Sequence, residues 1–480
     1  MLRADQEQAL IRLHRRQFVL GPEPLRAGED WLCRQVDEAT WLSHCPELRT
    51  GWTRDADGRE WVLLGLAVET APEGDAPLSS IADTSSSGVP GLYKSWAGRW
   101  LLITSGQVHS DAAALLGCFW AALGGRTWAS SSPALLAAAV FDSEIPTADP
   151  RPLLHEVGIS WVTPPRSRFP GINRLLPSQW LDLAAGEPRR RPWLPAIESS
   201  LGHERGLELV ATGVMTTLRR VATELGPPWL GLTAGFDSRV VLAASRRAGV
   251  EVRPFTRVSP RVSGADRRLP RALARACGYD HRFVHERHSD SDRWGLVLEH
   301  SAGHVARDDV EPLLQGVRDE LDGVSIGGHA FSVGGGFADL RRLPRTLDDP
   351  AEAAHQVADL FGEPVDSTAA AGVREWVEWA LQDPQEGLDW RDRFLIEQRL
   401  GGWLAAKEQV YDMARLRRFP LLNSARNYAL LLSLPEERRL RSGVQVELIR
   451  RLQPALLDYP FNPPEGGLRR IRRWARKIRP

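Results

Sequence analysis

The sequence predicts an α/β protein with two domains: a β-rich domain over residues 1–200 and a domain built on a parallel sheet over residues 201–480. Short apolar segments separated by turn residues dominate the first part. In the second part, apolar segments alternate with helical stretches, which is typical of a parallel sheet. The length of 480 residues also exceeds what one hydrophobic core usually organises. We expect residues 188–195, rich in Pro and Arg, to link the two domains.

Charge and composition exclude several classes of protein. The 61 Lys and Arg residues balance 61 Asp and Glu residues, so charge gives no reason to expect nucleic acid or acidic lipid as a partner. The four cysteines lack the spacing of a zinc site and fit a reduced cytoplasm. No apolar run approaches the ~20 residues of a membrane span. Because Arg3, Asp5 and Glu7 stand where a signal peptide would be apolar, we expect a cytoplasmic protein that does not contact the membrane.

In the first domain, several segments are expected to form strands. Trp61–Val68 is one, and Gly98–Thr104 and Gln107–His109 are two more that bracket a turn. A helix is expected over Ala134–Val140, because the preceding Pro suits the first helical position. Arg168–Leu183 reads as a turn, a Pro-linked corner and a strand.

The most informative stretch of the second domain is a strand, a tight turn and a helix. Trp229–Leu232 suits a buried parallel strand, and Ala-rich sequence from Val240 onward suits a helix. A turn of this kind points backbone N–H groups and the positive end of the helix dipole outward, which makes an anion site. Thr233 and Ser238 add hydroxyl groups, and Asp237 adds a carboxylate that can hold Mg²⁺ beside a polyphosphate. The stretch therefore predicts a pyrophosphate-binding loop.

The alternative for this stretch is an ordinary connection between a strand and a helix. It is not a Walker A loop, because the G-x-x-x-x-G-K-[ST] spacing and its Lys are missing. Two hydroxyls, a Gly and an Asp at fixed offsets nevertheless favour the binding loop over the ordinary connection.

Further strands and helices follow in alternation. We expect helices over Glu208–Leu225 and Leu269–Cys277, and parallel strands over Val252–Thr256, His281–Val284 and Gly323–Ile326.

Two of these strands end in residues suited to a ligand. Open α/β sheets bind ligands at the carboxyl ends of their strands, where Phe255 and Thr256 stand. Gly327 and Gly328 follow another strand and permit close backbone approach to phosphate. A single His at a strand edge, such as His281, is more often a hydrogen-bonded structural residue, so we leave it out of the site.

The loop resembles the S-G-G-x-D-S loop of the N-type ATP pyrophosphatases, specifically of the asparagine synthetase family. Thr233 takes the Ser position, Gly235 the second Gly, and Asp237 and Ser238 the final pair. Ala234 replaces the first Gly, and a Cβ there would cost about 1 kcal/mol if the position needed a positive φ.

The first domain is similar to the glutaminase domain of the same family. Gly98–Thr104 resembles its G-R-[WF] strand, Asp111 its D-x-x-G segment, and Phe169–Leu181 its F-x-g-I-x-x-L-x-P corner. The resemblance implies an Ntn-hydrolase-like β-rich sandwich. The family's glutaminases expose a Cys after removal of the first Met, but residue 2 here is Leu2. We therefore expect a degenerate domain that does not hydrolyse glutamine and acts as a scaffold.

The second domain resembles the family's ATP pyrophosphatase domain, an adenine nucleotide α-hydrolase-like parallel sheet with added helices. Asp266 and the helix end Leu273–Gly278 fit the family pattern loosely. The family's G-e-G-a-D-E-l-f-g-G-Y segment falls on residues 327–337, where Phe331 and Ser332 replace the acidic pair that handles metal and pyrophosphate. Asp308, Asp309 and Glu311 lie nearby in sequence, without any sign that they point inward.

The C-terminal third is expected to be helical, beginning with Phe394–Met413. Lys407–Asn423 resembles the family's D-x-x-s-M-a-x-x-x-E-x-R-x-P-F-L-D segment, anchored on Arg418. The family places a phosphate-contacting Lys farther on, where this chain offers Arg438, Arg439 and Arg441. Arg can clamp a phosphate but cannot donate a proton as Lys can. The basic tail Leu468–Arg479 is either a solvated amphipathic end or a docking surface for a peptide or partner protein.

The resemblance implies ATP-dependent activation of a carboxylate as an acyl-adenylate, followed by amide formation with release of AMP and pyrophosphate. Without a glutaminase, the amine belongs to the substrate, as in β-lactam synthetases and the macrolactam cyclases of lasso peptides. We expect ATP and Mg²⁺ to bind, with Asp237 as the metal ligand and Asp237, Arg418 and Arg439 in catalysis. The residues expected at the nucleotide are Leu232, Thr233, Ala234, Gly235, Phe236, Asp237, Ser238, Phe255, Thr256, Gly327 and Gly328.

The expected substrate is a small-molecule or peptide carboxylate that carries its own amine, with a precursor peptide or partner protein as a further partner. Two other functions remain open. One is a catalytically degenerate homologue that binds a partner or serves as a scaffold. The other is a nucleic-acid-modifying ATP pyrophosphatase such as a tRNA thiolase, which the neutral charge and the lack of a paired cysteine motif disfavour.

Overall fold

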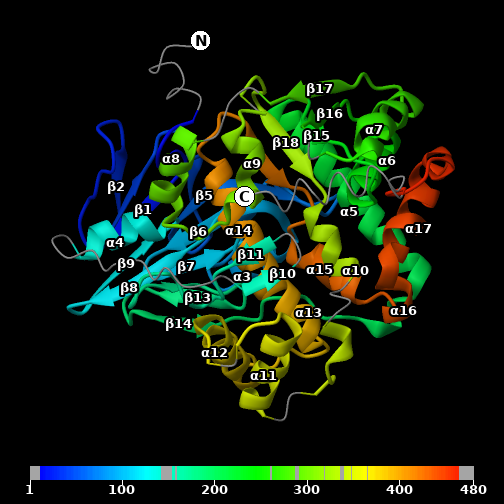
Figure 1. The fold of residues 1–480 in the computed structure, drawn as a ribbon. Coiled ribbons are helices and arrows are strands. Elements are labelled where there is room, and N and C mark those ends of the chain that lie inside the picture. Colours follow the sequence, from blue (N-terminus) through cyan, green and yellow to red (C-terminus); the bar gives the residue numbers. More distant parts are fainter. Residues whose placement is uncertain are drawn as a thin grey trace.

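The computed structural model describes residues 11–141, 154–156, 159–259, 262–286, 291–317, 319–335, 340–346, 349–364 and 366–463. Leu2, the end of the glycine-rich segment at residues 336–337, and the basic tail Leu468–Arg479 lie outside this set. The chain is a mixed α/β structure, with antiparallel sheets in its N-terminal part and a parallel sheet later (Figure 1).

Two six-stranded antiparallel sheets build the N-terminal part. In spatial order, the first contains β12 (Asn173–Arg174), β8 (Phe119–Leu123), β9 (Arg126–Ser130), β1 (Phe18–Gly21), β3 (Thr40–His44) and β2 (Leu32–Asp37). The second contains β14 (Glu187–Arg190), β13 (Gln179–Asp182), β7 (Gln107–Ser110), β6 (Trp96–Thr104), β5 (Glu60–Glu69) and β4 (Thr50–Arg54). Phe18 and Leu42 of the first sheet share one core with Val62 and Leu101 of the second. The two sheets therefore bury a common apolar layer, as a sandwich requires.

Most of the predicted N-terminal elements are confirmed. The expected strands correspond to β5, β6, β7 and β13, and the expected helix is α4 (Pro133–Phe141). The predicted linker is wrong in part, because Glu187–Arg190 pairs antiparallel with β13 as strand β14. Pro188 is tolerated there because β14 is the edge strand of its sheet. Trp193 of the same segment is 1% exposed, and its indole donates to the carbonyl of Ala112 at 2.8 Å.

The later part of the chain contains a five-stranded sheet in which all neighbouring strands are parallel. Its order is β17 (Arg282–His285), β16 (Arg253–Val258), β15 (Trp229–Gly231), β18 (Val324–Gly327) and β19 (Arg417–Pro420). The expectation of parallel strands is confirmed for the first four. The expectation of a wholly helical C-terminal third is wrong, because residues 417–420 pair with β18 as an edge strand. A short strand with two Arg residues carries little local signal, and its pairing depends on β18.

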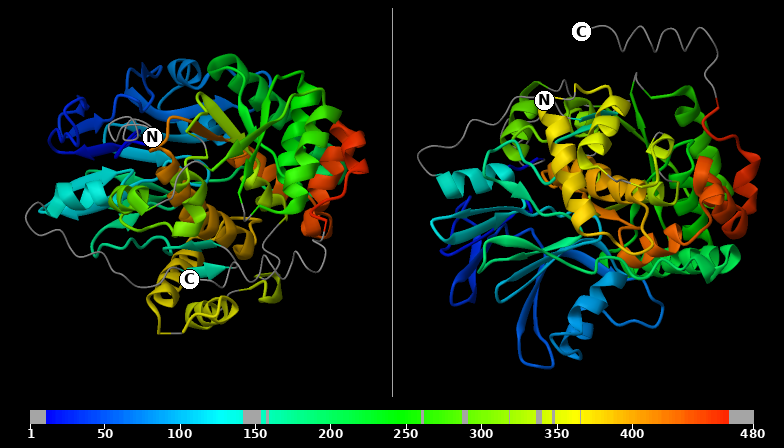
Figure 2. Two further views of the ribbon diagram at one scale, coloured as in Figure 1. Left: turned by 45° about the horizontal axis from the view of Figure 1, so that its top comes forward. Right: turned by 90° about the horizontal axis from the view of Figure 1, so that it is seen from below.

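Helices cover the parallel sheet and fill the C-terminal part. Helix α6 (Asp237–Ala248) packs against α5 (His203–Leu225) and α17 (Gly443–Leu452), and Figure 2 shows this group beside the parallel sheet. Helix α5 also contacts β5 of the antiparallel part. The other helices are α2 (Pro77–Ala82), α3 (Val89–Leu92), α7 (Gly264–Ala276), α8 (Ser291–Ser301), α9 (Arg307–Leu314), α10 (Ser332–Gly335), α11 (Pro350–Leu360), α12 (Thr368–Gln382), α13 (Trp390–Phe394), α14 (Ala405–Tyr411), α15 (Ala425–Leu432) and α16 (Glu436–Arg439). A π-helical segment, Leu395–Leu404, joins α13 to α14, and β10 (Leu154–Glu156) pairs with β11 (Ile159–Trp161).

The antiparallel part braces the edge of the parallel sheet. Gly98 of β6 has φ +123°, and a Cβ there would lie 2.1 Å from the carbonyl oxygen of Leu66 and 2.9 Å from the ring of Phe419 on β19. The amide of Asn423 donates to the Gly98 carbonyl at 2.7 Å. Buried Arg99 holds Asp412 through two hydrogen bonds of 2.9 Å each. These contacts fix the position of β19 and of the side chains that it carries.

Within the described residues, no helix is long and apolar enough to cross a membrane.

Candidate functional site

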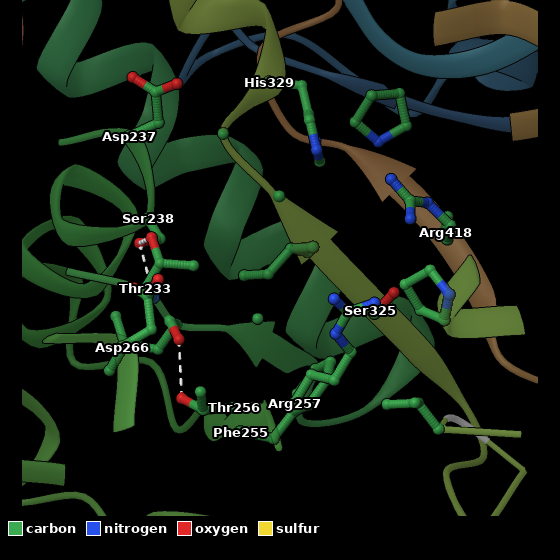
Figure 3. Close-up of a pocket in the computed structure, with 18 of the residues that line it drawn as sticks. Thr233, Asp237, Ser238, Phe255, Thr256, Arg257, Asp266, Ser325, His329 and Arg418 are labelled. Atoms are coloured by element: carbon green, nitrogen blue, oxygen red, sulfur yellow. Dashed lines mark hydrogen bonds between the residues drawn. The ribbon is translucent and has the colours of Figure 1, made fainter. Parts of the chain in front are cut away.

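A cavity of about 430 Å³ lies at the carboxyl ends of β15, β16, β18 and β19, the place where open α/β sheets bind ligands. Its lining comprises Gly231, Leu232, Thr233, Asp237, Ser238, Phe255, Thr256, Arg257, Val262, Asp266, Pro312, Val317, Ser325, Ile326, Gly327, Gly328, His329, Glu408, Arg418, Phe419 and Pro420. Figure 3 shows Thr233 and Ser238 on one side and His329 and Arg418 on the other. Most of the sequence-predicted nucleotide residues are thus brought together in one cavity.

The turn after β15 presents two hydroxyl groups to this cavity. The Oγ1 of Thr233 and the Oγ of Ser238 lie 3.1 Å apart, and the Ser238 Oγ also accepts the amide of Thr233 at 3.1 Å. Helix α6 starts at Asp237 without a side-chain N-cap bond. The amides of its first turn therefore remain available to a ligand, as at any uncapped helix N-terminus. Hydroxyls and amides together form the donor set that a phosphate group requires.

Asp237 lies at the opposite end of the cavity from Phe255 and Thr256 in Figure 3. Burial raises the pKa of its carboxyl to about 6, although a hydrogen bond from Gln445 and the charge of Arg399 act in the opposite direction. The Gln445 amide donates at 3.2 Å. A carboxylate that is poorly compensated in this way gains from a nearby cation. The side chain is therefore suited to hold Mg²⁺.

Gly328 packs directly against the start of α6. A Cβ built on Gly328 would lie 2.9 Å from the carbonyl oxygen of Asp237 and 3.0 Å from its Cβ. The φ of Gly328 is −99°, which any residue adopts, so the requirement for glycine here is steric. Gly328 therefore fixes how closely the two loops approach each other.

Three predicted nucleotide residues lie outside the cavity lining: Ala234, Gly235 and Phe236. Ala234 is 1% exposed, and its amide donates to the Oδ1 of Asp266 at 2.7 Å. Its φ is not in the positive range, so the Cβ in place of a glycine hydrogen causes no backbone strain. Phe236 stacks on Phe461 with ring centroids 4.2 Å apart. These three residues shape the back of the loop.

Asp266, in the first turn of α7, already accepts a hydrogen bond from the loop. Its Oδ1 accepts the Ala234 amide and its Oδ2 accepts the hydroxyl of Ser263 at 2.7 Å. Since this carboxylate occupies one loop amide, an incoming phosphate depends on the hydroxyls and on the first turn of α6. The cavity therefore offers fewer free amides than a fully open loop.

The opposite wall carries the cationic groups. Arg418 binds Glu408 through contacts of 2.6 and 2.9 Å, and its guanidinium also lies over the ring of Tyr411. Burial raises the pKa of the Glu408 carboxyl, but Arg418, Arg99 and His329 together outweigh this effect and lower it. Glu408 is thus a charged, buried anchor that holds Arg418 at the cavity.

The far end of the cavity combines an aromatic ring with a fixed hydroxyl. The Oγ1 of Thr256 donates to the carbonyl of Leu232 at 2.7 Å and lies 2.9 Å from the Nε2 of His281. Burial, together with the charge of Arg271, lowers the pKa of His281 to about 4. The predicted hydrogen bond of His281 is present, and the residue lies outside the cavity lining. Phe255 lines the cavity beside Thr256.

Phe331 and Ser332, at the positions where the resembled motif has an acidic pair, do not line the cavity. Phe331 is fully buried at 0% exposure, and the hydroxyl of Ser332 donates to the carbonyl of His329 at 3.0 Å. The acidic residues of the preceding segment do not replace them, because Asp308, Asp309 and Glu311 are absent from the lining. Glu311 instead accepts a hydrogen bond from the guanidinium of Arg257 at 3.2 Å.

Arg439 is a predicted catalytic residue that also lies outside the cavity lining. Its guanidinium donates to Asp392 at 3.1 Å and to the carbonyl of Leu434 at 3.2 Å, and the side chain is buried. Asp392 is shared with Arg341 in the same ion-pair network. These contacts hold Arg439 in a structural network, so we leave it out of the site proposed below.

Metal binding would rest on few protein ligands. No cluster of three or more His, Cys, Asp or Glu side chains in the described part of the chain has the arrangement of a metal site. Mg²⁺ keeps several waters and uses one or two carboxylates together with substrate phosphates. Asp237 alone therefore fits a magnesium ion that arrives with a nucleotide.

Some cavity residues were not predicted as site residues, above all His329, Glu408 and Arg257. His329 directly follows the glycine pair, which is the one local signal that places it at the strand exit. Glu408 and Arg257 reach the cavity from an unrelated helix and from the strand end beyond Thr256. No local pattern in their own segments marks them.

Comparison with known proteins does not assign the chain to a family. No protein-family model matches the sequence, and a search of curated proteins finds no matching protein.

Proposed function

We propose that the protein is an ATP-dependent, AMP-forming amide ligase or cyclase that needs no glutamine. The observation that carries the proposal is the cavity itself. At the carboxyl edge of a parallel sheet, it combines the Thr233 and Ser238 hydroxyls, an uncapped helix N-terminus and the carboxylate of Asp237. Arg418 stands on the facing wall (Figure 3). This is the donor and charge arrangement that a nucleoside triphosphate requires.

Each group has a role in this proposal. Thr233, Ser238 and the first turn of α6 hold the β- and γ-phosphates, and Phe255 and Thr256 face the nucleoside. Asp237 would hold Mg²⁺, and this ion, when bound, would spread the negative charge of the departing pyrophosphate. Arg418, fixed by Glu408, neutralises charge on the other side of the cavity. Gly328 lets the second loop pack against the start of α6, which keeps the two loops in this arrangement.

The reaction has two steps. A substrate carboxylate oxygen attacks the α-phosphorus of ATP, the bond to the bridging oxygen breaks, and pyrophosphate leaves with that electron pair. An amine of the same substrate then attacks the activated carbonyl carbon, loses a proton and expels AMP. We propose that this amine belongs to the substrate and does not come from glutamine. Lactam or macrolactam closure in natural-product or peptide modification fits this requirement.

A second candidate is a binding or scaffold protein that keeps the nucleotide fold without turnover. Two observations favour it: Phe331 is buried in place of an acid, and Asp266 already occupies the amide of Ala234. Both reduce the charge control available for pyrophosphate departure.

The test separates the two candidates. Mg²⁺-ATP is titrated by calorimetry into the wild type, into Ser238→Ala, and into Ser79→Ala, an exposed serine on α2 that serves as the control. Pyrophosphate release is then followed with ATP, hydroxylamine as the trapping amine, and a pool of amino acids and short acidic peptides. Binding that only Ser238→Ala weakens, together with pyrophosphate release, supports the ligase. Binding without release supports the scaffold, and no wild-type binding at millimolar ATP contradicts the ligase.

A further inference from the structure

A second hollow lies at the other ends of the strands that carry the cavity. This junction cleft, of about 270 Å³, is lined by Arg16, Glu47, Leu225, Gly323, Val324, Arg415 and Arg417. It lies at the start of β18, whereas the nucleotide cavity lies at the end of that strand. Consecutive residues of β19 serve the two places, because Arg417 lines the cleft and Arg418 lines the cavity.

The cleft holds more positive than negative charge. Three arginines line it, against the single carboxylate of Glu47. That carboxylate lies 3.9 Å from Arg16 and is shared with Arg15 at 3.0 Å and Arg12 at 3.9 Å. For Arg417 and Arg415, no carboxylate of the described residues lies within ion-pair distance. Glu47 alone therefore cannot neutralise the cleft.

Buried Arg16 also lacks enough negative charge around it. It is 7% exposed, and its terminal nitrogens donate to the carbonyl oxygens of Asp412, Ala414 and Arg415. Its Nε is buried without a hydrogen-bond partner among the residues that the structure describes. Burial, together with the charges of Arg417 and Arg15, lowers the pKa of Arg16 to about 10, although Asp412 and Glu47 act in the opposite direction. Asp412 is itself engaged by Arg99 in a two-pronged ion pair.

We propose that the junction cleft is a binding site for a small oxyanion, either a phosphate or a dicarboxylate. The planar guanidinium groups of Arg417 and Arg415 match two oxygens of such a group, and the ligand charge offsets the repulsion between Arg16 and Arg417. The charge of Arg16 is buried, so water screens it weakly and it gains more from a nearby anion than an exposed charge does. The site is separate from the nucleotide cavity and does not depend on nucleotide binding.

The experiment measures the thermal unfolding midpoint without nucleotide, with inorganic phosphate or glutarate titrated at constant ionic strength. The proteins are the wild type, Arg417→Gln, Arg415→Gln, and the control Arg126→Gln, whose arginine is exposed on β9. We expect a saturable rise in midpoint for the wild type and the control. In both cleft variants, the half-saturating concentration should increase at least fivefold.

The two titrations distinguish the chemical class of the anion. A response to phosphate alone identifies a phosphate site, and a response to glutarate alone identifies a dicarboxylate site. Without anion, Arg417→Gln should not lower the midpoint, because it removes a like charge beside buried Arg16. The proposal is overturned by the absence of any saturable response, or by an unchanged response in the cleft variants. Should Arg417→Gln not fold, the exposed Arg415 decides the question. Mg²⁺-ATP titration into Arg415→Gln should match the wild type, so this site and the nucleotide site succeed or fail independently.

Discussion

The loops after β15 and β18 leave neighbouring strands of one parallel sheet, yet they differ in what they present to the cavity. The first offers two hydroxyls and a carboxylate, of Thr233, Ser238 and Asp237. The second offers two glycines and His329, after which Phe331 turns into the core. One loop therefore supplies the chemical groups, and the other carries a glycine that lets it pack closely against the first.

The burial of Phe331 explains why the second loop cannot easily carry an acid at that position. Phe331 belongs to the large core that also contains Leu431 and Val444 of the helices beside it. The following Gly334 lies so close to Leu431 that a Cβ there would come within 3.0 Å of its side chain. The loop is thus anchored by packing, whereas the first loop is anchored by hydrogen bonds.

The strongest way to test this contrast is to place an acid in the second loop. Phe331→Asp should lower the free energy of unfolding by about 4 kcal/mol, because it removes a buried ring and buries a carboxyl group without a partner. Equilibrium unfolding in urea measures the loss. Ser332→Asp is the matched control and should cost less than about 1 kcal/mol, because its side chain is only half-buried. Equal losses in the two variants would contradict the packing role of Phe331.

The contact between the two loops can be broken at Gly328. A methyl group there meets the backbone of Asp237 at 2.9 Å, which displaces the start of α6. Gly328→Ala should weaken Mg²⁺-ATP binding about 30-fold, equivalent to about 2 kcal/mol, as measured by calorimetry. Gly335→Ala, in the same segment, has its nearest neighbour atom at 3.9 Å and should bind like the wild type. A wild-type affinity in Gly328→Ala would show that the loops do not need this close approach.

The elements with strong local patterns could be predicted from the sequence. Buried apolar segments gave β15, β16 and β18, and the turn at residues 233–238 identified the first loop because its groups are adjacent in the chain. Strand β2 was not predicted, because the sequence LCRQVD has no alternation of apolar and polar residues and its side chains are largely exposed. It forms a strand because it pairs with β3.

The parts of the site that could not be predicted depend on contacts between distant segments. Asp266 lies 32 residues from the amide of Ala234 that it accepts. Arg439 pairs with Asp392, 47 residues away, and lies outside the cavity lining. Arg418 is held at the cavity by Glu408, which lies on another element. Residue spacing alone cannot show which of several arginines forms an ion pair with a buried carboxylate in the folded protein. It does show which turn carries hydroxyls beside a helix start.

The buried carboxyl group of Asp237 should make the free energy of unfolding depend on pH. Its folded-state pKa is about 6, raised from 3.8 by burial, so the stability that its protonated form contributes is complete below pH 4 and is lost as the pH rises through 6. Asp237→Asn removes the charge, so it should be more stable than the wild type at pH 8 by on the order of 1 kcal/mol, without magnesium or nucleotide. At pH 4 the difference should vanish. Urea unfolding at the two pH values measures both, and a difference independent of pH would exclude a buried charge as its cause.

The smallest effect is expected at the residue where the loop departs from the pattern that it resembles. Ala234 is buried and has no positive φ, and its amide is bound by Asp266. Ala234→Gly therefore relieves no strain; it should lower the free energy of unfolding by about 0.5 kcal/mol through added backbone freedom and leave Mg²⁺-ATP affinity within about twofold. Calorimetry and urea unfolding of this single variant measure both quantities. A clear gain in affinity would mean that the alanine restrains the first loop. The contrast between a first loop that binds and a second loop that only packs against it would then no longer hold.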